Sequence, residues 1–109
     1  MKYLLTFNAD YCDEFYVEAY TITDTREHYD YLIEHQDSEQ AKEYGTVYVG
    51  FGSNEELEFD TISEFLDCVS IEEITDEQAK IVCSVIGDTF GLINPADTIC
   101  DMASDLATY

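Results

Sequence analysis

An excess of negative charge is the feature that most restricts what this chain can fold into. Lys and Arg number 4 in 109 residues, whereas Asp and Glu number 25, so the formal net charge is −21 at pH 7. Charge of this size usually indicates disorder, but disordered chains contain few aromatic residues. This chain has 9 Tyr and 6 Phe, and 46% of its residues are hydrophobic. We therefore expect one compact folded domain over residues 1–109.

The charge also restricts the class of partner. Direct binding of nucleic acid, like attachment to an anionic membrane, needs basic groups on the protein surface. The sequence therefore predicts neither, and it predicts that a charged partner is basic. The first ten residues have one Lys and an apolar run that is soon broken by polar and acidic residues. They do not match a signal peptide or a membrane span, so we expect the protein in the cytoplasm.

The first half of the chain shows the alternation of apolar and polar residues that is typical of strands. Residues 8–13 are expected to connect the first two strands, and residues 52–55 to form a tight turn before the fourth. The alternation predicts strands over residues 2–7, 14–23, 46–51 and 56–60.

Helical spacing predominates elsewhere. Between the second and third strands, residues 24–45 predict a helix that is capped by Asp24 with Glu27, frays after His35 and stops at Gly45.

Three more helices are predicted in the second half. Two capping boxes, Thr61 with Glu64 and Thr75 with Gln78, open helices over 62–69 and 76–86, and Asn94 precedes a last helix. Residues 87–92 are expected to form a turn. The predicted fold class is α+β. It comprises a small antiparallel or mixed four-stranded sheet and about four helices, concentrated in the C-terminal half.

The acids are unevenly distributed. From Glu43 to Glu77 there are 11 acids and no base, and from Ile81 onward there are 4 acids and no base. If the apolar residues of each strand face the core, the acids and tyrosines between them share one outward sheet face. The predicted partner-binding residues are Glu14, Glu18, Glu56, Glu58 and Asp60, with Tyr16, Tyr20 and Tyr48 between them and Glu64 and Asp67 on the following helix.

Such a face has a density of negative charge comparable to that of nucleic-acid phosphates. Alternate residues on a strand lie about 6.6 Å apart and neighbouring strands about 4.8 Å apart. Tyrosine rings between the carboxylates offer surfaces on which arginine guanidinium groups can stack. A basic groove that normally holds DNA could accept this face.

No motif indicates catalysis, a metal or a cofactor. Calcium-loop, phosphate-loop and nucleophile motifs are absent, and a two-metal nuclease would need a basic surface for its substrate. His28 and His35 are expected at the surface. The widely spaced cysteines favour free, mostly buried thiols over a zinc site; they are Cys12, Cys68, Cys83 and Cys100. We predict that the chain is not an enzyme, although a small enzyme without a recognisable motif stays an alternative.

A short, strongly acidic α+β chain with tyrosines among its surface carboxylates resembles the DNA-mimic inhibitors that phages use against host defence nucleases. The resemblance is to the anti-CRISPR and antirestriction types and lies in overall character. Segments 1–15 and 48–55 also look like parts of small phage proteins of unassigned role. The resemblance to DNA-mimic inhibitors implies that the acidic face blocks the groove in which a CRISPR effector binds target DNA and its adjacent motif. It further implies a bacterial host cytoplasm as the location.

Other interpretations stay open at this point. The chain could be an antirestriction mimic, an acidic adaptor that binds a basic protein unrelated to nucleic acid, or a salt-adapted housekeeping protein. A salt-adapted protein is expected to spread acids over all faces and to need molar salt for folding, whereas a mimic is expected to concentrate them. The sequence leaves self-association open.

Overall fold

Two antiparallel sheets and five helices make up the part of the chain that the computed structural model describes: residues 2–12, 15–50, 55–85, 87, 89–91 and 93–108. The predicted α+β class is confirmed. The elements follow in the order β1 (Lys2–Cys12), β2 (Phe15–Thr23), α1 (Glu27–His35), α2 (Glu39–Tyr44), β3 (Val47–Gly50), β4 (Glu56–Phe59), α3 (Ile62–Leu66), β5 (Val69–Ile74), α4 (Asp76–Val85), β6 (Thr89–Gly91) and α5 (Pro95–Ala107).

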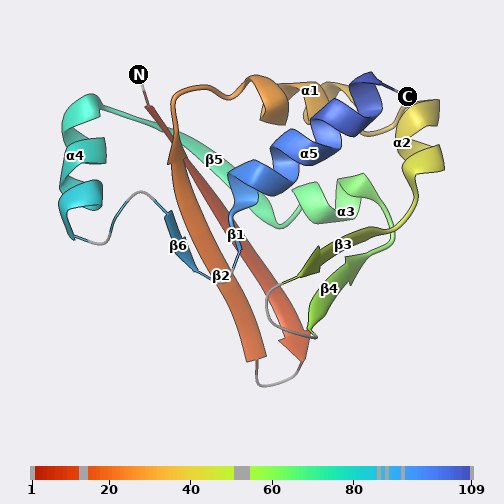
Figure 1. Ribbon diagram of the computed structural model, residues 1–109, viewed down its shortest axis with the longest axis horizontal. Coiled ribbons are helices and arrows are strands. Elements are labelled where there is room, and N and C mark those ends of the chain that lie inside the picture. The colour runs from red at the N-terminus through yellow and green to blue at the C-terminus, as the bar shows by residue number, and fades with distance from the viewer. Residues whose placement is uncertain are drawn as a thin grey trace.

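The larger sheet has the strand order β5-β1-β2-β6, whereas β3 and β4 pair only with each other within the described residues (Figure 1). The prediction that the third and fourth strands belong to the same sheet as the first two is therefore wrong. β1 pairs on one edge with β2 and on the other with β5, and β6 takes the outer edge of β2. The edges that β3 and β4 would have used are occupied.

Three local predictions fail because of this pairing. The predicted helix over 62–69 ends at Leu66, since Val69 begins β5 and the Asn8 N–H donates to the Cys68 carbonyl at 3.0 Å. Residues 8–12 extend β1 instead of forming a connection. The expected turn at 87–92 contains the short strand β6. The turn predicted at 52–55 falls, apart from Glu55, outside the described residues.

The main core lies between the larger sheet, the β3–β4 sheet and the helices α1, α3 and α5, which gather on one side in Figure 1. Phe7 of β1 makes an edge-to-face contact with Phe59 of β4, with their ring centroids 6.2 Å apart. The ring centroid of Phe65 of α3 lies 5.6 Å from that of Phe7 and 5.5 Å from that of Phe59. The three rings hold the β3–β4 sheet against the core. Helix α4 stands apart, and its buried Ala79 lies outside this cluster.

Helix starts follow the predicted caps where the cap is local. The Gln78 N–H donates to Thr75 Oγ1 at 3.1 Å, and the Thr75 N–H donates to Gln78 Oε1 at 2.9 Å, which completes a capping box. Thr61 likewise caps α3 by accepting from the Glu64 N–H at 3.1 Å. Asn94 Oδ1 accepts from the Ala96 N–H at 3.0 Å and begins α5. The three predicted caps are confirmed, but the capping box at Thr61 is not reciprocal, because the Glu64 carboxylate accepts from the Asp60 N–H and not from the Thr61 N–H.

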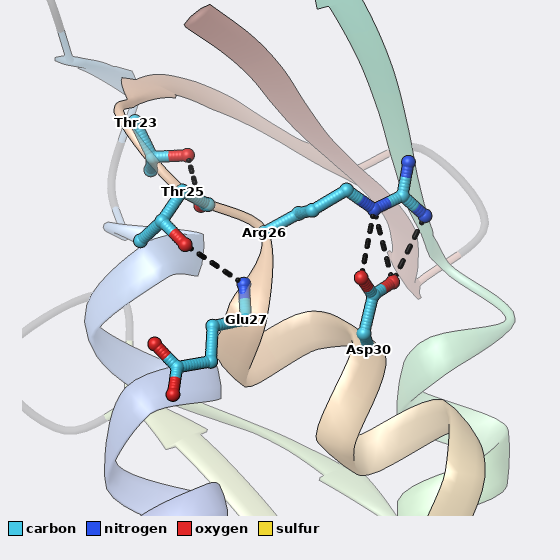
Figure 2. A network of polar contacts seen from close by, with 5 residues as sticks. All are labelled: Thr23, Thr25, Arg26, Glu27 and Asp30. Carbon is cyan, nitrogen blue, oxygen red and sulfur yellow. Dashed lines mark hydrogen bonds and ion pairs between the residues drawn. The ribbon is translucent and has the colours of Figure 1, made fainter.

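The first helix begins differently. Asp24, the predicted cap, instead forms an ion pair with Lys2, which raises the pKa of Lys2 and lowers that of Asp24. Figure 2 shows the replacement: Thr25 Oγ1 accepts from the Glu27 N–H at 3.1 Å, and Thr23 Oγ1 donates to the Thr25 carbonyl at 2.8 Å. The helix ends at His35, and Gly45 (φ 74°) stops the segment, as the sequence predicted. The single fraying helix that was predicted is wrong in one respect, because Ser38 caps a second helix, α2, by accepting from the Ala41 N–H at 3.2 Å.

Gly91 is required where β6 meets β2. Its φ is 110°, and a Cβ there would lie 2.5 Å from the Glu18 carbonyl oxygen and 2.7 Å from Ala19 Cα. Because both are backbone atoms of the paired strand, we expect Gly91→Ala to lower the free energy of unfolding by about 2 kcal/mol or more. Chemical denaturation measures the change.

Gly87→Ala is the matched control for Gly91→Ala. Gly87 also has a positive φ, 95°, but a Cβ there meets nothing within 4 Å. It should therefore cost only the backbone strain, about 1 kcal/mol. Equal losses in the two variants would show that the contact between β6 and β2 is not tight.

Candidate protein-binding surface

Every acidic side chain that the structure describes is exposed, whereas bases are few. Three of the four bases form ion pairs: Lys2 with Asp24, Arg26 with Asp30, and Lys42 with Glu39 at 3.8 Å. Four bases cannot neutralise 25 acids. The protein therefore presents a strongly negative surface to any partner.

Arg26 shows how a base is used internally. Its guanidinium binds the Asp30 carboxylate through Nε at 2.9 and 3.0 Å and through Nη2 at 2.9 Å (Figure 2). The same group lies 5.9 Å from the ring centroids of Tyr3 and Tyr29. A partner would have to break these contacts to use Arg26.

The predicted residues on β2 face away from the main core. Val17 and Ala19 are buried, and Tyr16 and Glu18, which alternate with them, are exposed, as the alternation predicted. Tyr20 is less available than predicted, because its ring stacks on Phe90 of β6 at 5.5 Å and its hydroxyl is buried. Glu14 lies outside the described residues.

A second group of predicted residues lies on the β3–β4 sheet and α3. Tyr48 is 58% exposed and pairs across the strands with Glu58, and Glu56 follows on the same outward side. Glu64 is exposed while its carboxylate accepts from the Asp60 N–H at 3.0 Å, which links α3 to the end of β4. We call this group the β3–β4 surface; it consists of Tyr48, Glu56, Glu58, Asp60, Glu64 and Asp67.

The two groups do not form one sheet face, so that prediction is wrong. Glu18 projects from the side of the larger sheet opposite to Ala19, which is in the main core. Phe59 contacts Phe7 within that core, and Glu58 projects the other way. The prediction assumed that the four strands share one sheet, and their separation into two sheets divides the acids between two outward faces.

A row of aspartates on α5 was missed by the sequence analysis. Asp97, Asp101 and Asp105 are exposed and recur every four residues, which places them on one side of the helix. They line a groove of about 510 Å³ that also contains all four residues of β3. The spacing was visible in the sequence, but only the apolar residues of this helix were used to predict it. The acidic region therefore extends from the β3–β4 surface to α5.

Tyr44 lies in the same groove and responds to these aspartates. Burial raises the pKa of Tyr44, and the charge of Asp105, a hydrogen bond to it and the charge of Asp101 raise it further. Above the ordinary pKa of 10.0 the unfolded chain loses this proton while the folded chain keeps it. The contribution to stability is therefore present below pH 10 and is lost as the pH rises through the raised pKa.

Asp105→Asn should lower the pKa of Tyr44 toward its ordinary value, because it removes a negative charge and a carboxylate acceptor, while the effect of burial stays. The Tyr44 ring resonance, assigned with Tyr44→Phe and followed by NMR between pH 8 and pH 12, measures this. Asp97→Asn removes the same charge from the groove without being among the causes and serves as the control. An unchanged Tyr44 in Asp105→Asn would contradict the assigned contact.

The described residues contain no group of three or more His, Cys, Asp or Glu side chains placed to hold a metal ion. Cys68, Cys83 and Cys100 are free thiols, as predicted. The expectation that they are mostly buried is wrong, since Cys83 is exposed and the others are half-buried. Helix α4 buries only Ala79, which leaves Cys83 at the surface. Burial raises the pKa of the Cys68 thiol, which makes it a weaker nucleophile.

None of the helices in the described residues has the length and apolar character needed to cross a membrane. Comparisons of the chain with protein-family models, with curated proteins and with solved structures found no match.

Proposed function

We propose that this chain is a DNA-mimic inhibitor that binds the basic DNA-binding groove of a host defence nuclease, of the CRISPR-effector type, in a bacterial cytoplasm. The observation that supports it best is the base-free acidic region formed by the β3–β4 surface and α5. No base occurs between Glu43 and Glu77 or after Ile81, the parts of the chain that build this region.

The chemistry of the region suits an arginine-rich groove. Carboxylates along a strand lie about 6.6 Å apart, so several can pair at once with guanidinium groups that normally hold phosphates. Tyr48, exposed beside Glu58, offers a ring on which a guanidinium can stack. Inhibition by occupation of the groove requires no catalytic group on the chain. The exposed residues of β2, Tyr16 and Glu18, would lie outside this contact.

A DNA-binding assay with purified nuclease tests the proposal. Adding the protein to a CRISPR effector that carries its guide should reduce binding of labelled target duplex, and excess duplex should reduce binding of the protein. Association should slow as salt rises from low to physiological strength, because screening weakens the steering of an acidic protein to a basic groove. Simultaneous binding of protein and duplex would contradict mimicry.

The same assay separates the related alternatives. An antirestriction mimic would compete with duplex on a restriction enzyme instead of a CRISPR effector. An acidic adaptor would bind its basic partner equally well with and without duplex. Turnover of a small substrate would favour the enzyme alternative.

A salt-adapted protein is a second candidate because exposed acids also lie on α1, α2 and α4. Thermal unfolding at a series of NaCl concentrations distinguishes the two. A DNA mimic should be folded at ordinary ionic strength, and its melting temperature should rise moderately as salt screens the repulsion between acids. A chain that folds only in molar salt would favour salt adaptation.

A further inference from the structure

The groove between β3 and α5 meets an unpaired strand edge. All four residues of β3 line it, whichever way their side chains point, so the strand faces the groove along its edge. Within the described residues β3 pairs only with β4. In an antiparallel strand alternate residues direct their N–H and C=O groups to opposite edges, so half of those of β3 point away from β4. Such an edge can accept another strand.

The opposite wall of the groove is the row of aspartates on α5. Asp97, Asp101 and Asp105 are four residues apart, which corresponds to about 6 Å along a helix. Alternate side chains of an extended peptide are about 6.6 Å apart. The two lengths are also similar, since β3 spans about 10 Å from its first to its last Cα atom and the segment from Asp97 to Asp105 spans about 12 Å. Every second side chain of an added strand would meet an aspartate.

The charge in the groove selects the chemistry of the occupant. None of the described residues that line it is basic. Tyr48 is exposed at its side and can stack with a guanidinium group. Its three aspartates are about 6 Å apart along the helix, so a row of cations fits them better than a single ion.

We propose that this groove binds an extended basic segment of the partner, which adds as a strand to the edge of β3 and presents Arg or Lys at alternate positions to Asp97, Asp101 and Asp105. The backbone hydrogen bonds to β3 provide the strand contact, and the ion pairs to α5 provide the selectivity. This inference rests on the proposed function in that the partner is basic, and it names the part of the partner that is bound.

Fluorescence anisotropy with labelled synthetic peptides tests the inference. The probe is a capped peptide in which arginine and threonine alternate over the length of the groove. A peptide of the same composition with its arginines contiguous, and an alternating peptide N-methylated at every second residue, are the controls. The alternating peptide should bind about tenfold more tightly than either control at physiological salt. Equal affinities would overturn the inference, because they would indicate unspecific attraction between charges.

Variants and hydrogen exchange locate the binding site. Replacing Asp97, Asp101 and Asp105 together by Asn should weaken the alternating peptide about tenfold. Glu34→Gln with Asp37→Asn and Glu72→Gln removes the same charge from exposed positions elsewhere and should have little effect. The bound peptide should also protect those amides of β3 that point away from β4. Equal loss in both triple variants, or no protection of β3, would overturn the inference. If the variant of Asp97, Asp101 and Asp105 loses the peptide but still binds the nuclease, the partner does not use this groove. That result would overturn the inference without affecting the proposed function.

Discussion

Replacing Glu56, Glu58 and Asp60 together by Lys should weaken binding to the nuclease about a hundredfold or more. All three side chains are exposed on the β3–β4 surface, so each would present a positive charge to the basic groove. The fold should be kept or become more stable, because the net negative charge falls and repulsion decreases. Surface plasmon resonance gives the affinity, and thermal unfolding reports the stability.

The control is a second triple variant with the same change in charge. Glu34→Lys, Asp37→Lys and Glu72→Lys alter exposed acids that lie outside the β3–β4 surface and α5. It should weaken binding much less and mainly through a slower association rate. If the first variant binds with unchanged affinity, the β3–β4 surface is not the contact, and if both variants lose binding equally, the net charge alone determines it.

Phe65→Ala should lower the free energy of unfolding by about 3 to 5 kcal/mol. Phe65 is fully buried and packs on Phe7 of the larger sheet and Phe59 of β4, so its removal leaves a cavity between the two sheets. This loss is a large share of the total stability of a small domain. Urea unfolding followed by circular dichroism measures it.

Phe65→Leu is the matched control, because it keeps an apolar side chain in the same position and should cost less. A loss below about 1 kcal/mol in Phe65→Ala would mean that the ring does not pack as described. Where Phe65→Ala remains folded, it should also weaken nuclease binding, since the β3–β4 sheet would no longer be held in a fixed orientation.

Local features of this fold could be predicted from the sequence. The caps at Thr61, Thr75 and Asn94 form within a few residues of chain, so their residue types and spacing suffice. The alternation on β2 and β3 correctly separated the buried Val17 and Val47 from the exposed residues beside them. Both kinds of signal depend on short-range geometry.

Strand pairing could not be predicted, because it joins segments that are far apart in the chain. Val69 continues a helical spacing in the sequence. In the structure it is the first residue of β5 and pairs with Phe7 of β1. Gly91 suggested a turn, yet it lies where β6 meets β2. The cap predicted at Asp24 failed for the same reason, since a distant residue, Lys2, binds its carboxylate.

The candidate site was predicted in part. The outward positions of Glu56, Glu58 and Tyr48 followed from alternation and are confirmed as exposed. Their union with Glu18 and Tyr16 depended on sheet membership and fails with it. Asp97, Asp101 and Asp105 have a four-residue spacing in the sequence, but only the fold places them opposite β3.

DNA mimicry is tested most directly by capture of the partner with tagged protein from a lysate of bacteria that carry restriction and CRISPR systems. The beads are washed with or without an excess of duplex DNA, and retained proteins are identified by mass spectrometry. We expect recovery of a DNA-binding nuclease that the duplex displaces. A partner retained equally well in the presence of duplex would contradict DNA mimicry.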